Sequence, residues 1–413
     1  MKKIYFISIF LILFSGTNFS HGKIGYNSGL DRTISFPDTE DYLTLSTDLH
    51  THSVFSDGHV WPNIRVAEAQ KDSIDVLAIT EHLEYQPHIN QIPHEDRNSS
   101  YVEAKKSASG SDLIVINGSE ITREMPPGHI NAVFVKDANK LHNMDPKLLP
   151  EAKELIEERA QGAELPEEEM RVIENYALGN LWPALEALVE AKKQGAFVFW
   201  NHPMWGSQAP DGIARLDEMH KEFIEKGLLH GIEIVNTNTY SEEAFNIALE
   251  NNLALIGTSD VHNLIEWDYD ASKNEHRPIT LVLAKERNEE SIKEALFARR
   301  TVVVFKDKLM GKSENLIPLL ESIMSISSNG YTKGTQILKM EIKNNSSANM
   351  VLQNLSDVNF SNNDDLITIP KNGKINLQVK TLENLESLNL KFKVLNALTA
   401  PKENPIVEFR IKT

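Results

Sequence analysis

The stretch Asp48-Leu49-His50-Thr51-His52-Ser53, followed closely by Ser56-Asp57-Gly58, decides how the rest of this chain is interpreted. It follows a short apolar run, Leu45–Leu49, that is typical of a β-strand. Residues two apart on a strand point to the same side, so His50 and His52 can bind one ion together. Neutral imidazole and carboxylate are the usual protein ligands of zinc, iron and manganese. A single His-x-His pair is common, so this stretch needs support from elsewhere in the chain.

That support comes from five further pieces, most of which end a short apolar run. They are Thr80-Glu81-His82, Gly118-Ser119-Glu120, Gly128-His129-Ile130, Asn201-His202-Pro203 and Ser259-Asp260-Val261-His262. Six ordered pieces in one chain predict a polynuclear metal site. A carboxylate can bridge two cations with its two oxygens, and Glu120 is the natural candidate for that bridge. Asp260 and His262 repeat the two-residue spacing of His50 and His52.

Strand-like and helix-like segments alternate from Leu45 to about Phe305. The expected strands are Leu45–Leu49, Val76–Thr80, Leu113–Asn117, Ile130–Val135, Ala196–Trp200, Ile232–Val235, Ala254–Gly257 and Ile279–Leu283. The expected helices are Asn63–Lys71, Trp182–Gln194, Leu216–Lys226, Glu242–Asn251 and Glu289–Arg300. This alternation argues for a parallel sheet, either open or closed into a barrel. The predicted ligands follow strand ends, where barrel enzymes build their active sites, and this favours the barrel.

Two regions do not follow this alternation of strands and helices. Residues 141–180 are charged and helical in character, with helices expected at Glu151–Arg159 and Glu167–Ile173, and we interpret them as an insertion. The insertion either covers the site or decorates the surface, and surface decoration is the favoured interpretation. From residue 318 to 413, short alternating runs separated by turn signals predict an antiparallel β-sandwich domain. Its pattern looks self-contained and includes no histidine.

Composition and charge restrict the class of protein. The 413 residues include no cysteine, so disulfides, thiolate metal sites and cysteine nucleophiles are excluded. The formal charge of −17 makes a nucleic-acid partner unlikely, because the phosphate backbone would meet net repulsion. Lys2 and Lys3 precede an apolar stretch, Ile4 to Phe14, that is too short for a comfortable membrane span. We expect residues 1–22 to be a signal peptide, with bacterial export to the periplasm or outside and no stable membrane span after cleavage. The sequence does not indicate an oligomeric state.

The ordered motifs resemble the PHP (polymerase and histidinol phosphatase) superfamily over about residues 44–306. The resemblance implies a distorted (β/α)7 barrel with a trinuclear site of divalent transition metals such as Zn, Mn or Fe. By this pattern the first ion is held by His50, His52, Glu120 and Asp260, the second by Glu120, His129 and His202, and the third by Asp57, His82 and His262. We expect Glu120, Asp260 and His262 to be catalytic. Glu81 replaces the aspartate usual in the family and is expected to orient a ligand.

The predicted function is hydrolysis of a small phosphomonoester or phosphodiester by a metal-bound hydroxide. Histidinol phosphate is a poor candidate for an exported protein. One alternative is a metal-dependent amidohydrolase, which also uses His-x-His on a first barrel strand; the other is a non-catalytic surface or glycan-binding protein. Trp205 is equally a candidate for the substrate pocket and for ordinary packing. Three arginines are candidate phosphate clamps, namely Arg97, Arg123 and Arg277.

Overall fold

The computed structural model describes residues 32–413 apart from 144, 161–166 and 274. The predicted signal peptide, residues 1–22, lies outside the described residues. Among the described residues, no helix is both long enough and apolar enough to cross a membrane.

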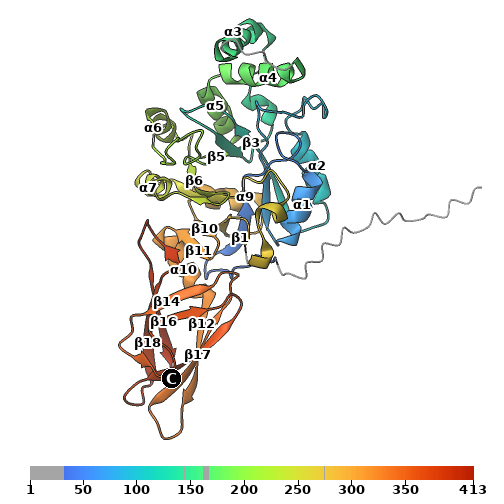
Figure 1. The fold of residues 1–413 in the computed structure, drawn as a ribbon. Helices are drawn as coiled ribbons and strands as arrows, with labels where there is room; N and C mark the ends of the chain where they lie inside the picture. The colour runs from blue at the N-terminus through green and yellow to red at the C-terminus, as the bar shows by residue number, and fades with distance from the viewer. Residues whose placement is uncertain (1–31, 144, 161–166, 274) are drawn as a thin grey trace, which may run out of the picture. The chain divides into compact units, whose positions relative to one another are not determined.

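A single curved sheet, covered by helices, forms the first part of the fold (Figure 1). The strand order is β19-β11-β10-β9-β1-β2-β3-β4-β5-β6-β7, with β8 paired to β6. The strands are β1 (Leu43–Asp48), β2 (Val76–Ile79), β3 (Ile114–Ile121), β4 (Ile130–Val133), β5 (Phe197–Trp200), β6 (Gly231–Asn236), β7 (Thr239–Tyr240), β8 (Ala254–Thr258), β9 (Ile279–Ala284), β10 (Thr301–Phe305), β11 (Lys308–Gly311) and β19 (Ala397–Leu398). The α/β barrel prediction is confirmed, and each of the eight expected strands is present.

The sheet is mixed, so the expectation of parallel pairing throughout was wrong. β1, β2 and β3 pair in parallel, as do β5, β6 and β8. β4 is antiparallel to both of its neighbours, and β9 is antiparallel to β1. β8 is joined to β9 by the Thr280 hydroxyl, which exchanges 2.9 Å hydrogen bonds with the backbone of Gly257. A Cβ on Gly257 would lie 2.3 Å from Val303 of β10, so only glycine permits the close approach of β8 to β10.

The helices flank the strands near the positions that the sequence predicts. They are α1 (Pro62–Lys71), α2 (Ser99–Ser107), α5 (Ala184–Gln194), α6 (Glu218–Glu225), α7 (Glu242–Glu250), α8 (Ile265–Asp268), α9 (Glu289–Phe297) and α10 (Ser313–Ile323), with 3-10 turns η1 (Ala138–Leu141), η2 (Pro146–Leu148), η3 (Glu167–Glu169) and η4 (Ala271–Lys273). Capping interactions fix the ends of several of these helices. The side chains of Ser241 and Asn288 accept N-cap hydrogen bonds at α7 and α9, and Gly195 ends α5 with a φ of 75°. α2 and α10 were not predicted.

The insertion forms a pair of helices, α3 (Leu149–Ala160) and α4 (Met170–Leu181), which lie side by side (Figure 1). Ala152 and Ile156 of α3 share a small core with Ala177 and Leu178 of α4. At Gly179, α4 approaches the barrel so closely that a Cβ there would lie 2.3 Å from Cγ of Glu84. The insertion is therefore held against the loop that follows β2.

The C-terminal region is an antiparallel β-sandwich, as predicted. One sheet has the order β12-β13-β17-β15 and the other β16-β14-β18-β20. The strands are β12 (Met324–Tyr331), β13 (Ile337–Asn344), β14 (Met350–Asn354), β15 (Asn359–Phe360), β16 (Leu366–Ile369), β17 (Lys374–Lys380), β18 (Ser387–Val394) and β20 (Ile406–Lys412). Alternate residues of β13 and β18 are buried, which is the pattern of strands with one face on a core.

This region is not self-contained, in contrast to the expectation from its pattern. β19 pairs in parallel with β11 of the barrel sheet. One continuous core joins buried side chains of β10, β11 and α10 to those of the sandwich, for example Leu316 and Leu320 to Leu338 and Leu390. Pro318 lies inside α10, so the first sandwich strand begins only at Met324. The barrel and the sandwich therefore share a core through α10.

Candidate metal centre

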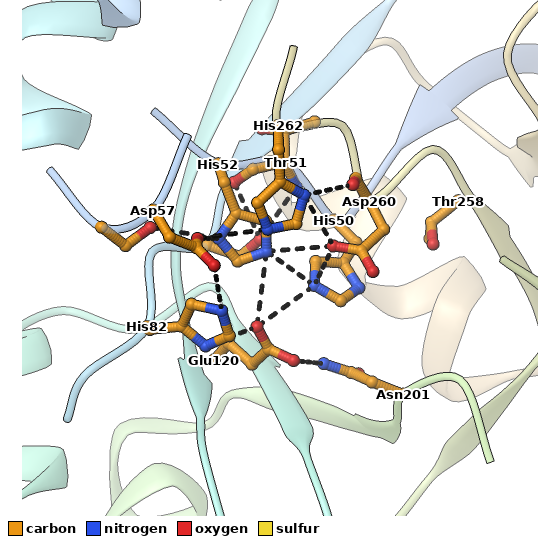
Figure 2. A network of polar contacts seen from close by, with 12 residues as sticks. His50, Thr51, His52, Asp57, His82, Glu120, Asn201, Thr258, Asp260 and His262 are labelled. Carbon is orange, nitrogen blue, oxygen red and sulfur yellow. Dashed lines mark hydrogen bonds and ion pairs between the residues drawn. The ribbon is translucent and has the colours of Figure 1, made fainter. Parts of the chain in front are cut away.

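Backbone hydrogen bonds bring the loop after β1 against the loop after β8. The amide of His52 donates to the carbonyl of Val261 at 3.1 Å, and the amide of Asp260 donates to the carbonyl of His50 at 3.0 Å. These bonds place the side chains of His50, His52 and Asp260 beside one another (Figure 2). The two motifs lie far apart in the sequence, and a parallel bridge between Thr51 and Val261 makes them one structural unit.

Four donor atoms form a compact cage at the centre of this unit. The Nε2 atoms of His50 and His52 are 3.0 Å apart. Oδ1 of Asp260 lies 3.2 Å from the first and 3.1 Å from the second. Oε2 of Glu120 lies 3.4 Å from Nε2 of His50 and 3.3 Å from Nε2 of His52. Ligands about 2.0–2.1 Å from a tetrahedral ion would be about 3.3–3.5 Å from one another, so the two imidazole nitrogens and either carboxylate oxygen have the spacing of ligands to one ion.

Glu120 belongs to β3 and faces two groups of donors with its two oxygens. Its Oε1 lies 3.0 Å from Nδ1 of His129 and 3.4 Å from Nε2 of His202, and accepts a 2.8 Å hydrogen bond from Asn201. Its Oε2 is buried and has no hydrogen-bond partner, although the cage imidazoles surround it. An orphaned buried carboxylate oxygen is costly unless a cation offsets it. The geometry of Glu120 is that expected of a bridging ligand.

A third group of donors lies on the other side of His52. Asp57 Oδ1 is 3.1 Å from Nε2 of His262 and 3.8 Å from Nδ1 of His52, while Asp57 Oδ2 is 3.5 Å from Nε2 of His82. Asp57 Oδ1 is also buried and has no hydrogen-bond partner. His82 Nδ1 lies 2.9 Å from Oε2 of Glu120, so this ring stands between the third group and the bridge (Figure 2).

The structure thus brings together all nine predicted ligands, His50, His52, Asp57, His82, Glu120, His129, His202, Asp260 and His262. One detail of their placement differs from the prediction. His129 precedes its strand, β4, and does not follow it. Because β4 is antiparallel, its N-terminal end lies at the same edge as the C-terminal ends of β3 and β5. His129 reaches the common edge for that reason.

Hydrogen bonds fix the tautomers of two ligands. A backbone carbonyl only accepts, so Nδ1 of His262, 2.8 Å from the carbonyl of Asp260, carries the proton. Nδ1 of His50 likewise donates to the Glu233 carboxylate at 2.8 Å. In both neutral rings the lone pair is then on Nε2, which faces the centre. Both imidazoles are therefore held ready to bind a cation.

The charges of the centre shift the pKa values of its members in opposite directions. Burial alone would raise the pKa of Glu120, but His82, His50 and His129 hold it well below its ordinary value. Burial would lower the pKa of His262, yet the bonded Asp57 and the nearby Asp260 raise it to about 9. For His52, burial dominates and lowers the pKa to about 3, with help from His262. The carboxylates are consequently ionised and available as anionic ligands.

Sequence inspection missed Glu233, which supports the centre from β6. This side chain is fully buried. Besides the His50 bond, Oε1 accepts from the Thr258 hydroxyl at 2.6 Å. Oε2 accepts from the backbone amide of His202 at 2.6 Å and from Asn236 at 2.9 Å. The available signal was a lone carboxylate in the apolar strand Gly231–Asn236, because a buried carboxylate requires partners.

Glu81 points away from the donors, as expected of a residue that orients a ligand. Its carboxylate accepts from the Ser53 amide at 3.0 Å and from the hydroxyls of Ser53 and Ser56. These bonds hold the turn that carries Asp57.

The three candidate phosphate clamps are engaged elsewhere, so that prediction was wrong. Arg277 is fully buried and pairs with Asp48 at 3.0 Å and Asp72 at 2.8 Å. Arg123 pairs with Glu84. Arg97 donates to Gln86 and to a backbone carbonyl. None of the three lines the cavities at the centre, because each serves an internal polar network.

Two cavities open at the donors. One, of about 290 Å³, is lined mainly by the predicted ligands together with Asn236 and Thr237. The other, of about 330 Å³, extends from Asp57, His82 and His129 to Val172, Ile173 and Tyr176 of α4. Trp205 lines both, which decides in favour of its pocket role. The interpretation of the insertion as surface decoration was wrong, since α4 forms a wall beside the centre.

Comparison with known proteins follows the same division of the chain. An Ig-like domain family matches residues 324–410. No curated protein matches significantly. Among solved structures, a two-domain protein from Bacteroides vulgatus ATCC 8482, described as containing a predicted PHP-like metal-dependent phosphoesterase, shares 34% identity at a TM-score of 0.76; the match covers 92% of this chain and 98% of that one.

Two further matches are weaker. A candidate metal-dependent phosphoesterase from Bifidobacterium adolescentis shares 18% identity over 62% of this chain and 97% of its own, with a TM-score of 0.40. An amidohydrolase from Chromobacterium violaceum, solved with sulfate and no metal, shares 17% identity over 52% of this chain and 87% of its own, with a TM-score of 0.38. At these scores neither match bears on function.

Proposed function

The chain belongs to the family of two-domain PHP-like metal-dependent phosphoesterases, and from that premise we propose that it hydrolyses a small phosphate ester at a centre of three divalent ions. The proposal rests on one observation above others. The Nε2 atoms of His50 and His52 lie 3.0 Å apart, and each lies within 3.4 Å of both Oδ1 of Asp260 and Oε2 of Glu120, at distances that ligands of a shared ion would have.

Three sets of donors would hold the three ions, and the first two sets share Glu120. His50, His52, Glu120 and Asp260 would hold the first; Glu120, His129 and His202 the second; and Asp57, His82 and His262 the third. The second and third sets have three protein donors each, which leaves positions for water and substrate. His52 belongs to the first set through Nε2, while its Nδ1 lies 3.2 Å from the Ser56 hydroxyl and 3.8 Å from Asp57.

The chemistry needs both cations and oriented side chains. Divalent ions, when bound, lower the pKa of coordinated water and stabilise charge on phosphate oxygens. Glu233 holds the ring of His50, and the carbonyl of Asp260 holds the ring of His262, so both expose Nε2. No lysine or arginine is among the described residues that line the two cavities. Phosphate binding should therefore depend wholly on the bound ions, because Asp57, Glu120 and Asp260 alone would repel it.

The test combines metal analysis with a substrate panel. Purified full-length protein should hold about three manganese or zinc ions per chain, and should release phosphate from nitrophenyl phosphates. Chelated protein should lose that activity and also its binding of inorganic phosphate, measured by calorimetry. A reproducible content of one ion or fewer would refute the trinuclear centre. Faster turnover of amide or lactone substrates would instead favour an amidohydrolase.

We also propose that the protein is exported. The basis is the basic start, Lys2 and Lys3, followed by the apolar stretch Ile4–Phe14. Mass spectrometry of the native protein should find a mature N-terminus between His21 and Gly25 in an extracytoplasmic fraction. Full-length chains that retain Met1 and stay in the cytoplasm would contradict export.

A further inference from the structure

The larger of the two cavities changes character from one end to the other. At the inner end it is lined by the predicted ligands Asp57, His82 and His129. At the outer end it is lined by apolar and aromatic side chains, namely Tyr85, Val172, Ile173, Tyr176 and Trp205. We call this outer end the apolar pocket. It is built by the insertion helix α4 together with loops of the barrel.

Aromatic rings run from the ligands into the apolar pocket. The ring of Tyr85 lies 6.0 Å from that of His82 and 6.1 Å from that of Tyr176, edge-on in both cases. Trp205 packs edge-on against His129 at 5.5 Å. Trp205 keeps 48% of its surface exposed and Tyr85 keeps 37%. Large aromatic side chains left open beside a polar centre are characteristic of a binding surface.

Charge and size restrict what can enter. Among the described residues that line this cavity, the only charged groups are the predicted ligands at its inner end, so the pocket offers no cationic side chain to neutralise an anionic or zwitterionic group. Its volume of about 330 Å³ is at the small end of ligand sites, which range over roughly 300–1,000 Å³. An apolar cavity of about 150 Å³ already holds a benzene molecule. One aromatic ring on a short linker would fit.

We propose that the substrate is a phosphate ester of a small uncharged alcohol that carries an aromatic ring, and that α4 determines this specificity. The inference rests on the proposed phosphoesterase function, since the phosphate must lie among the ligands for the alcohol to reach the apolar pocket. In the reaction, water gives its hydroxyl to phosphorus and its proton to the departing alcohol. The insertion would thus act as a selectivity wall beside a general phosphoesterase centre.

Binding tests the apolar pocket independently of turnover. Metal-loaded full-length protein is titrated calorimetrically with 2-phenylethylphosphonate and with methylphosphonate, neither of which can be hydrolysed. The phenyl compound should bind at least tenfold more tightly. Tyr176→Ala and Ile173→Asn should each reduce that preference to below threefold. Arg171→Ala changes an exposed residue of the same helix that does not line the cavity, and should keep the preference.

Two controls keep the outcomes distinct. Unchanged methylphosphonate affinity shows that a variant retains its fold and its metals. Equal affinity of the wild type for the two phosphonates, or an equal loss of both in the α4 variants, would overturn the inference.

Hydrolysis separates the inference from the proposed function. 2-Phenylethyl phosphate and glycerol 3-phosphate both release an alkyl alcohol, so their intrinsic reactivities are similar. A kcat/KM at least tenfold higher for the phenyl ester, lost in Tyr176→Ala, supports the inference. Turnover of both esters without preference refutes the inference and leaves the function standing. Tight 2-phenylethylphosphonate binding without turnover of either ester refutes the function and leaves the apolar pocket standing.

Discussion

Glu233→Gln should weaken metal binding although the residue touches no ion. The carboxylate accepts four hydrogen bonds, two on each oxygen. Glutamine keeps the shape but offers one oxygen and one amide nitrogen. The backbone amide of His202 and the side-chain amide of Asn236 can only donate, so the glutamine oxygen should turn toward them. The amide nitrogen must then face His50 and Thr258.

The size of the expected loss in metal affinity follows from the change at the His50 ring. An amide N–H directed at Nδ1 forces the ring proton onto Nε2, the atom that faces the other three donors of the cage. The ring must change tautomer, and lose that hydrogen bond, before it can bind a cation. Changes to groups that orient metal ligands typically cost 10–100-fold in affinity, or about 1.4–2.7 kcal/mol. We expect a loss within that range for the ion that His50 contacts.

Two measurements check this reasoning. Chelator competition gives the manganese and zinc affinities. Imidazole nitrogen NMR of the chelated protein identifies the protonated nitrogen of His50 at a pH where the ring is neutral, because, against the effect of burial, Asp260, Glu120 and Glu233 raise the pKa of His50 well above its ordinary value. Glu218→Gln, on the exposed face of α6, is the matched control, because it is the same substitution in a solvated side chain. An affinity within twofold of wild type, or an unchanged Nδ1–H tautomer in Glu233→Gln, would refute the proposed role of Glu233.

Three further outcomes are expected. Glu120→Gln should slow single-turnover hydrolysis at least tenfold more than Asp57→Asn, because the two oxygens of Glu120 face two donor groups; equal losses or the reverse order would contradict the bridge. Burial lowers the pKa of His220 to about 4, so its contribution to stability is complete above the unfolded value of about 6.5 and declines as the pH falls toward 4. The destabilisation caused by His220→Asn should thus shrink by about 2–3 kcal/mol between pH 7.5 and 4.5 in denaturant unfolding, whereas a constant difference would exclude this linkage. Truncation after Gly311 removes α10, whose four fully buried side chains contribute about 1.5–3 kcal/mol each, so the barrel should unfold or aggregate; a soluble, cooperatively unfolding product would show that the shared core is dispensable.

The sequence predicted which side chains gather at the centre, because their signal is local. His50 and His52 follow a strand, and a strand end fixes the direction of two side chains without knowledge of the rest of the fold. The apolar strands were found for the same reason, since burial on both faces makes them continuous hydrophobic runs. Whether two strands pair in parallel or antiparallel cannot be predicted from the residues of one strand alone. β4 has the apolar composition of the strands that pair in parallel, but the connection from β3, residues 122–129, is too short for a crossover helix, and β4 pairs antiparallel.

What the sequence could not predict depends on tertiary neighbours. Glu233 has no motif around it, and its role follows from the packing of β6 against the loops after β1 and β5. Arg277 looked available for phosphate, but the fold buries it between Asp48 and Asp72. The role of the insertion also depends on its tertiary neighbours. Its charged helices resemble a solvated appendage, and Val172 and Tyr176 become a cavity wall only because α4 is held against Glu84.

The described linings of the two cavities contain no lysine or arginine, so the charge of the centre depends on its carboxylates and on bound ions. Its three carboxylates, Asp57, Glu120 and Asp260, carry a formal charge of −3, and three divalent ions would carry +6. A loaded centre would attract a phosphate ester, and a chelated one would repel it, without any arginine. The negative charge of the whole chain, −17, then opposes long polyanions while a single small phosphate still finds a local positive site. Selectivity for the alcohol must come from contacts that carry no charge, and the apolar pocket beside α4 is where the structure provides them.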